Sequence, residues 1–144
     1  MTDDLHAAVA DRLRADAQRY TGQRRALVEL LADDAPVSIP ELLQRRPGLA
    51  QSSAYRNLAV LERAGVVHRI VTSHDFARYE LAEDLTHHHH HHLICTSCGA
   101  VTDFEMADEV EHQIEAALSQ AARRSGYQVH GHRLDLVGTC PDCA

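Results

Sequence analysis

Apolar residues recur at helical spacing through the first third of the chain. Leu5, Val9 and Leu13 are four positions apart, so they would share one face of a helix over residues 4–17. Thr21 is a suitable N-cap for a second helix, because its hydroxyl can accept a hydrogen bond from a free N–H of the first turn. The pattern therefore predicts that the chain begins with two helices.

Two more helices follow, each with a recognisable start or end. Ser38 is followed by Pro40 and, at the third position, by Glu41, which is the arrangement of a capping box. A fourth helix is expected over residues 52–64 and ends at Gly65, because glycine readily adopts the left-handed conformation that closes helices. Its inner face should carry Tyr55, Leu58 and Leu61.

The apolar period then shortens to two residues. VVHRIVT (66–72) and ARYELA (77–82) predict two strands, which SHDF (73–76) would join. Helices followed by a two-stranded ribbon are typical of a winged helix-turn-helix, in which the helix at 52–64 would be the recognition helix. The first half of the chain is therefore predicted to bind DNA.

The second half alternates strands with one helix. Strands are expected at 90–96, 100–105 and 127–139, and an amphipathic helix at 107–124. The boundary between the halves falls near residues 81–86. The predicted fold class is α+β, with a winged helix-turn-helix followed by an α/β domain.

Charge separates the same two halves. Residues 1–78 contain 11 Arg and 10 Asp or Glu, a net charge of +1, whereas residues 79–144 contain 3 Arg and 11 acidic residues, a net charge of −8. All 14 basic residues are Arg, whose side chain suits bidentate contacts with phosphate and guanine. Contacts with nucleic acid are thus expected from the first half only.

Other function classes find little support in the sequence. No apolar run reaches the length of a membrane span, and the acidic start MTDDLHAAVADRL does not resemble a signal peptide, so we expect a cytoplasmic protein with no membrane partner. The absence of H-E-x-x-H, of a nucleophile motif and of a phosphate loop argues against an enzyme. A protein that only stores zinc would explain the histidines but not the winged helix.

The four cysteines form two pairs, Cys95-x-x-Cys98 and Cys140-x-x-Cys143. Structural zinc commonly takes four tetrahedral thiolate ligands from two such pairs. Reduced pairs or a disulfide are the alternatives, but a chain without a secretion signal favours metal. We therefore predict a structural zinc site made of four cysteines.

Six consecutive histidines, residues 87–92, lead into the first cysteine pair. Neighbouring side chains of a strand point to opposite faces, so His90 and His92 would share one face, and His89 and His91 the other. The run could therefore serve two metal sites placed back to back. A purification tag or a solvated loop is the alternative, although apolar residues follow the run directly.

Further ligands would have to come from other elements. The candidates are His68 and Glu80 on the ribbon, Glu83 and Asp84 near the boundary, Glu111 on the second-half helix and His132 on the last strand. Four other histidines are expected to be ordinary surface residues: His6, His74, His112 and His130.

Four segments of the chain resemble the ferric uptake regulator superfamily. They are YTGQR (20–24), PGLAQSSAYRNLAVLERAGVV (47–67), HHHHHHLICTSCG (87–99) and GHRLDLVGTCPDC (131–143). Their order and spacing are specific and cover nearly the whole chain. Within the superfamily, YRNL, the LTHH start of the histidine run and the C-terminal segment most resemble the zinc uptake regulators.

The resemblance implies a homodimeric, metal-responsive repressor that binds palindromic, A/T-rich operator DNA. It implies a winged-helix DNA-binding domain over 1–81, a hinge over 82–86 and a metal-binding dimerisation domain over 87–144. The residues expected to contact DNA are Arg19, Tyr20, Arg24, Gln51, Ser52, Ser53, Tyr55 and Arg56.

The resemblance also implies three metal sites. Their ligands would be Cys95, Cys98, Cys140 and Cys143 for structural zinc; His68, Glu80, His90 and His92 for a regulatory metal at the hinge; and His89, His91, Glu111 and His132 for an additional metal. The hinge lacks the cysteine that zinc regulators often place there, and Glu80 stands where iron regulators have a glutamate. Zinc is expected at the regulatory site, but nitrogen and oxygen ligands also accept Fe(II) or Mn(II). An iron-, manganese- or peroxide-sensing regulator is therefore the alternative.

Overall fold

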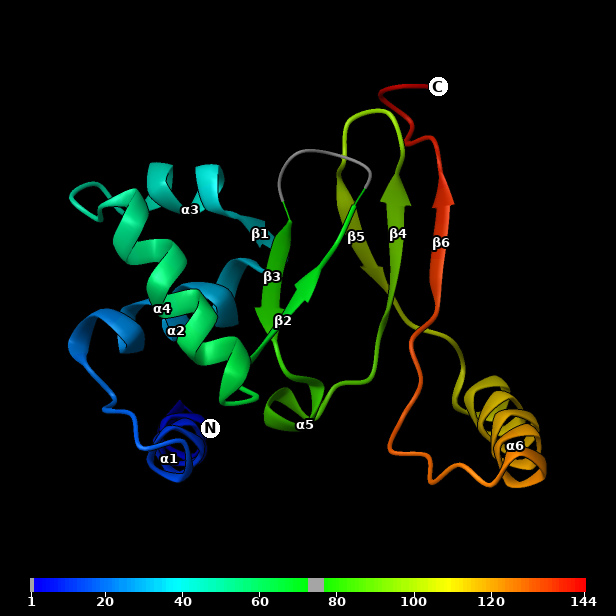
Figure 1. Ribbon diagram of the computed structural model, residues 1–144. Coiled ribbons are helices and arrows are strands. Elements are labelled where there is room, and N and C mark those ends of the chain that lie inside the picture. The colour runs from blue at the N-terminus through cyan, green and yellow to red at the C-terminus, as the bar shows by residue number, and fades with distance from the viewer. Residues whose placement is uncertain (1, 73–76) are drawn as a thin grey trace.

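The chain forms a helical first half and a second half built on a small sheet (Figure 1). The computed structural model describes residues 2–72 and 77–144. The first-half elements are α1 (Thr2–Ala15), α2 (Gly22–Asp34), β1 (Val37–Ser38), α3 (Ile39–Arg45), α4 (Gln51–Arg63), β2 (Val67–Ile70) and β3 (Arg78–Leu81). The elements that follow are α5 (Glu83–Thr86), β4 (His91–Cys95), β5 (Val101–Phe104), α6 (Asp108–Ser125) and β6 (Asp135–Gly138). The predicted α+β fold class is confirmed.

The helices of the first half begin where the sequence provides caps. Thr21 Oγ1 accepts a hydrogen bond from the Arg24 amide at 3.2 Å, and Ser38 Oγ accepts one from the Glu41 amide at 3.4 Å. Gly65, with a φ of +77°, follows α4. These local signals explain why the predicted helix limits agree with the structure to within two residues.

The apolar core lies beneath the four helices and the first sheet. Helix α4 packs on α3 and β2, and α2 packs on β3. The fully buried side chains include Val9, Leu13, Leu27, Val28, Leu42, Leu58 and Leu61. This core holds α4 in place with its outer face exposed, and Tyr55, predicted on the inner face, lies on that exposed face instead.

The predicted ribbon is part of a three-stranded sheet. Its order is β1-β3-β2, with antiparallel pairing throughout. Strand β1 was not predicted, because two residues are too short to show a period. The expected connection at 73–76, which includes His74, lies outside the described residues.

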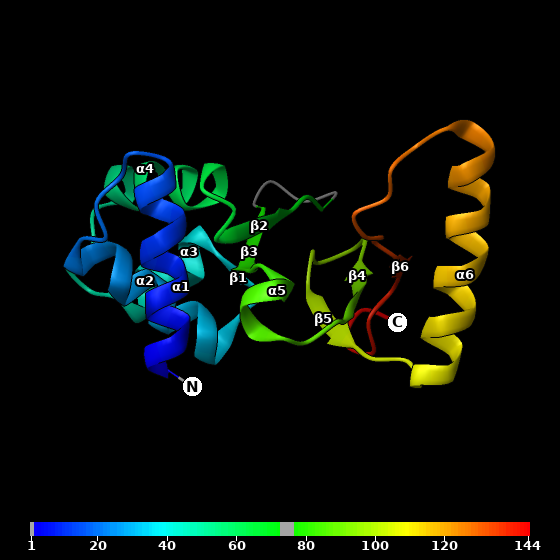
Figure 2. The ribbon, with the colours of Figure 1, turned by 90° about the horizontal axis from the view of Figure 1, so that it is seen from below.

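The second sheet has the order β5-β4-β6, with β4 antiparallel to β5 and parallel to β6. The predicted strand over 127–139 is wrong in length, because only Asp135–Gly138 pairs with β4. Residues 127–134 instead carry the chain from the end of α6 back to the sheet (Figure 2).

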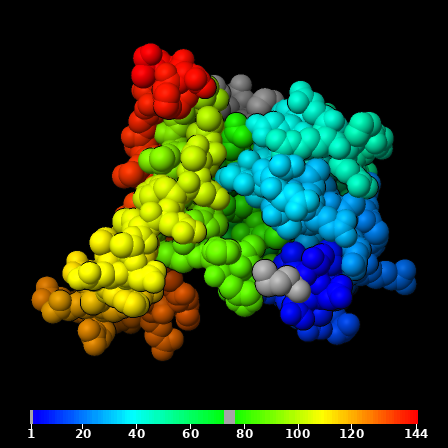
Figure 3. Space-filling model, turned by 180° about the vertical axis from the view of Figure 1, so that it is seen from behind, coloured from blue at the N-terminus to red at the C-terminus, as the bar shows by residue number. Residues whose placement is uncertain are grey.

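Helix α6 projects from the body of the molecule (Figures 2 and 3). None of its residues is buried, and Val110 and Leu118 are exposed. Gly126, with a φ of +74°, closes it near the predicted end. Within the described residues, no helix combines the length and apolar character that a bilayer span requires.

Candidate metal centres and nucleic-acid interface

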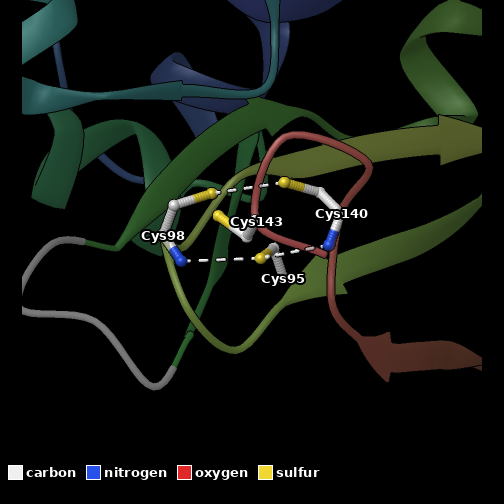
Figure 4. A group of neighbouring side chains, drawn as sticks. All are labelled: Cys95, Cys98, Cys140 and Cys143. Carbon is white, nitrogen blue, oxygen red and sulfur yellow. Dashed lines mark hydrogen bonds between the residues drawn. The ribbon is translucent and has the colours of Figure 1, made fainter.

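Four thiols meet at one end of the second sheet (Figure 4). Their sulfur atoms all lie within 4.8 Å of one another, and the Sγ atoms of Cys98 and Cys140 are 3.8 Å apart. A tetrahedral zinc ion with Zn–S bonds of about 2.3 Å requires sulfur atoms about 3.8 Å apart. All four residues are free thiols, not disulfides, and their arrangement fits zinc. We call Cys95, Cys98, Cys140 and Cys143 the cysteine knuckle.

The backbone around the cysteine knuckle favours thiolates. The amides of Cys140 and Cys98 donate to Cys95 Sγ at 3.3 and 3.5 Å, and these hydrogen bonds lower the pKa of Cys95 to about 6. Contacts with the Cys140 and Cys98 thiols raise the pKa of Cys143 to about 12. The four thiols therefore need a bound cation to be ionised together, which is the condition that zinc satisfies.

A second group of ligand atoms joins the two halves of the chain. Glu80, on β3, places Oε1 2.8 Å from His92 Nε2 and Oε2 3.0 Å from His90 Nε2. Carboxylate oxygens of Asp103 lie 3.5 and 3.6 Å from the same two nitrogens. We call Glu80, His90, His92 and Asp103 the hinge cluster. Two imidazoles and two carboxylates that converge in this way can hold a divalent transition metal.

The charges of the hinge cluster depend on one another. Burial raises the pKa of Glu80, but hydrogen bonds with His92 and His90 outweigh this effect, so its pKa is lowered overall. Burial, followed by repulsion from Glu80, raises the pKa of Asp103. Asp135 Oδ1 accepts a hydrogen bond from His92 Nδ1 at 3.2 Å, which directs the lone pair of Nε2 into the cluster. A cation between the two carboxylates would remove their repulsion.

The structure brings Asp103, and not the predicted His68, together with Glu80, His90 and His92. His68 pairs with Glu80 across β2 and β3, and the two residues line one pocket together with His90 and His92. The His68 side chain is nevertheless exposed and lies outside the converging ligand atoms. Asp103 is brought in by the register of the second sheet, where it pairs with His92. A lone carboxylate in a strand gives no sequence signal of such a role.

A third group lies on the opposite side of β4. Its ligand atoms, from His89, His91, Glu111 and His132, lie within 4.8 Å of one another, and we call it the outer cluster. His89 Nε2 is 3.2 Å from His132 Nε2 and 3.3 Å from Glu111 Oε2, and Glu111 also contacts His91. Glu111 Oε2 is buried and, among the described residues, has two imidazole nitrogens 3.3 and 3.6 Å away but no hydrogen bond of good geometry. The outer cluster therefore also fits a bound cation.

The position of the histidine run distinguishes a site from a tag. Alternation brings one pair of histidines to the hinge cluster and the other to the outer cluster, as strand geometry predicts. His91 is 1% exposed and His92 is 6% exposed, whereas a tag or a solvated loop would leave both in solvent. His87 and His88, at the start of the run, are exposed and belong to neither cluster.

Helix α4 is held by a polar network that the sequence did not reveal. Arg24 Nε donates to Asn57 Oδ1 at 3.0 Å, and Asn57 Nδ2 donates to Gln23 Oε1 at 2.7 Å. Arg24 also donates to the carbonyl of Arg19 at 2.7 Å. Arg24, predicted to contact DNA, is thus engaged within the protein, where it fixes α4 on α2.

Tyr20, also predicted to contact DNA, is engaged in the same way. Its hydroxyl lies 2.6 Å from His6 Nδ1, and burial raises the pKa of Tyr20 to about 12. His6 Nε2 is 3.4 Å from a Glu29 oxygen. His6 is therefore a buried residue that links α1 to α2, and not the surface residue that we expected.

The other predicted DNA contacts gather at the start of α4 and in the loop before α2. Exposed side chains are those of Arg19, Gln51, Ser52, Tyr55 and Arg56, with Ser53 partly buried. Arg56 donates to Ser53 Oγ at 3.5 Å, and Arg19 and Arg56 both carry positive charge on this surface. An exposed helix start of this kind suits entry into a major groove.

Comparison with known proteins gives one consistent result. The sequence profile described as "Ferric uptake regulator family" matches residues 16–137. The chain is 33% identical to the ferric uptake regulation protein of Campylobacter jejuni, over 91% of this chain and 83% of that protein. It is 30% identical to the peroxide operon regulator of Bacillus subtilis, over 92% of this chain and 88% of that protein.

Solved structures agree in fold. The ferric uptake regulator of Helicobacter pylori, described as having three functional metal-binding sites, superposes with a TM-score of 0.73 at 22% identity, over 99% of this chain and 93% of that chain. The Vibrio cholerae ferric uptake regulator gives a TM-score of 0.68 at 28% identity, over 89% and 96% of the two chains. A zinc-bound manganese uptake regulator gives 0.58 at 28% identity, over 92% and 98%.

Proposed function

Because the chain belongs to the ferric uptake regulator family, a family of metal-responsive transcription regulators, we propose that it is a zinc-responsive repressor that binds palindromic operator DNA as a homodimer. Named relatives include iron and peroxide regulators, and one structural relative is a manganese uptake regulator. The proposal of zinc therefore rests on the resemblance of this chain's own segments to zinc uptake regulators.

The hinge cluster is the observation that carries the proposal. Glu80 belongs to the winged-helix half, whereas His90 and His92 belong to the second half. A metal held by all of them ties the two halves together and fixes the angle between them. That angle sets the spacing of the two recognition helices in a dimer, which must match the spacing of the operator half-sites. Metal then favours the DNA-binding state in proportion to its higher affinity for that state.

The other two groups have different proposed roles. The cysteine knuckle holds a structural zinc, because its thiolates form a closed set of four ligands. The outer cluster holds an additional metal beside the sheet, where Glu83 Oε2 lies 2.8 Å from His89 Nδ1 and orients that ligand. The exposed start of α4 contacts bases, and Arg19 and Arg56 contact phosphate or base edges.

The experiment is a test of metal-dependent operator binding. Tag-free protein is used to select duplexes from a pool with a randomised core, in the presence of chelator-buffered zinc. The selected duplex is then titrated with the wild type, with Glu80→Gln and with Glu105→Gln as the matched control. Glu105 follows β5, is exposed and lies outside all three groups.

We expect zinc-dependent binding that Glu80→Gln weakens by about 10- to 100-fold and that Glu105→Gln leaves unchanged. Loss of a residue that only hydrogen-bonds a metal ligand already costs this much, and loss of the ligand carboxylate itself should cost at least as much. Selection of no specific duplex at any metal concentration would refute a DNA-binding regulator. Switching by Fe(II) or Mn(II) but not by zinc would retain the regulator and refute the choice of zinc.

A further inference from the structure

Arg78 bridges the two halves of the chain through contacts that do not include the hinge cluster. It is the first residue of β3, and its Nε donates to the carbonyl of Gly99 at 2.9 Å. Its NH1 lies 2.6 Å from Glu41 Oε1 in α3. The Arg78 side chain is only 17% exposed. The Arg78 guanidinium thus joins the turn of the cysteine knuckle to α3, the first helix of the helix-turn-helix.

The carbonyl that Arg78 contacts is positioned by the cysteine knuckle. Gly99 follows Cys98 directly, is buried and has a φ of +75°. Its amide donates to the Cys95 carbonyl at 2.9 Å, and the Cys95 amide donates to the Ala100 carbonyl at 2.9 Å. The direction of the Gly99 carbonyl therefore follows from the turn that brings Cys95 and Cys98 together around a metal.

The other partner of Arg78 lies at the start of α3. Glu41 is in the first turn of α3, where the Ser38 side chain caps the helix, and Arg78 pairs with Ser38 in the register of β1 and β3. Helix α3 packs against α4, the proposed recognition helix. A partly buried guanidinium–carboxylate pair is weakly screened by solvent, and its geometry is well defined.

We propose that Arg78 is a positioning residue that couples the cysteine knuckle to the helix-turn-helix. With metal in the knuckle, the Gly99 carbonyl has a fixed direction. Arg78 binds this carbonyl and Glu41 together, so it fixes the position of α3 relative to the knuckle. Helix α3 then holds α4 at the angle that DNA requires. The DNA-binding step rests on the proposed function, but the coupling between knuckle and helix does not. The structural zinc then has a second role, because its loss disturbs the helix-turn-helix as well as the second half of the chain.

Coupling of this kind is reciprocal. If a loaded knuckle stabilises the position of α3, then breaking the Arg78 contacts must also weaken the hold of the knuckle on its metal. The knuckle can be loaded with Co(II), whose thiolate charge-transfer absorption reports this site alone among the three groups. Release of Co(II) to a chelator then measures the coupling without DNA.

The experiment compares Arg78→Gln, Arg78→Lys and Glu41→Gln with the wild type. Arg69→Gln is the matched control, because Arg69 lies on the neighbouring strand β2 and pairs with Glu62 inside the first half. We expect Arg78→Gln to release Co(II) about 5- to 30-fold faster and to weaken operator binding by a similar factor. Glu41→Gln should act in the same direction, and combining the two should add little. Arg78→Lys should recover part of the loss, and Arg69→Gln should leave Co(II) release unchanged.

Two further readouts separate coupling from other roles. Amide exchange over residues 39–45 should quicken in Arg78→Gln, and the salt dependence of operator binding should keep its wild-type slope. A slope reduced by about one, with normal Co(II) release, would mean that Arg78 contacts phosphate and would overturn the proposal. Unchanged Co(II) release in both Arg78→Gln and Glu41→Gln would also overturn it. If the wild type shows no metal-dependent DNA binding, the proposed function fails, while Co(II) release and amide exchange still decide the coupling.

Discussion

The two halves of the molecule bury different kinds of side chain. The apolar core extends from Val9 to Leu85 and consists of aliphatic residues with Tyr79. Beyond Leu85, the buried apolar residues of the described chain are only Ile94 and Cys95. The buried polar residues of this second half are histidines of the two metal-ligand clusters.

This difference indicates that the second half depends on what it binds. Burial of apolar surface stabilises the first half without any ligand. The ligand groups of the second half instead carry repelling charges or unpartnered atoms that a cation would satisfy. Its exposed apolar residues include Leu93, Val110, Leu118, Leu136 and Val137, which we assign to the interface of the proposed homodimer. Metal and a second copy would therefore supply what the apolar core supplies in the first half.

Loss of the knuckle metal should produce the largest difference in stability between the two halves. A structural zinc contributes about 10 kcal/mol or more to folding, so Cys140→Ser should unfold much of the second half while α1 to α4 stay folded. Amide hydrogen exchange, followed element by element, measures this difference. Thr139→Ser, at the exposed neighbouring position, is the control. Equal loss of protection in α4 and in β4 would show that both halves unfold as one unit.

Much of the fold could be predicted from local signals. Caps such as Thr21 and Ser38 marked the helix starts, and the change of period marked the ribbon. The two-residue strand β1, the helix α5 and the true length of β6 could not be predicted, because each depends on tertiary pairing or packing. The spacing of the cysteine pairs was informative because it reflects the metal's own geometry.

The sites were predictable to the extent that their residues lie in a regular element. Alternation along the start of β4 and the two residues before it assigned the histidines correctly to two groups. Asp103 and Asn57 were missed, because only the sheet register and the packing of α2 on α4 reveal their partners. Tyr20 and Arg24 stay predicted DNA contacts, and their hydrogen bonds within the protein could not be predicted because the sequence does not show which elements pack together.

A cavity in the apolar core should destabilise the first half and leave the second half with its metal, the reverse of what loss of the knuckle metal does. Leu58, on α4, is fully buried, and a buried Leu→Ala substitution typically costs about 2–5 kcal/mol. We expect Leu58→Ala to lower the thermal midpoint of the first half. Zinc in the cysteine knuckle should stay tightly bound, as titration with a chelator would measure. Ala59→Gly, at the exposed neighbouring position of the same helix, controls for lost helix propensity of about 1 kcal/mol. Release of the knuckle zinc in Leu58→Ala alone, beyond the roughly 5- to 30-fold effect expected from the Arg78 contacts, would contradict the view that each half is stabilised mainly by its own means.

The smallest expected effect concerns a residue that contacts the hinge cluster from outside. Asp135 accepts a hydrogen bond from His92 Nδ1, so Asp135→Ala should free the ring to rotate and weaken metal binding at the hinge cluster by about 10- to 100-fold. Competition with a chelator measures this loss, and Asp142→Ala, an exposed carboxylate near the end of the chain, is the control. The cysteine knuckle should keep its metal and the first half its thermal midpoint, because neither contains His92. If Asp135→Ala instead unfolds the second half, then the side chain supports the sheet as well as the metal, and ligand binding and folding cannot be separated there. If the metal affinity of the hinge cluster does not change, Glu80 and Asp103 alone orient the imidazoles. The second half of the chain is then more rigid without its metal than its few buried apolar residues imply.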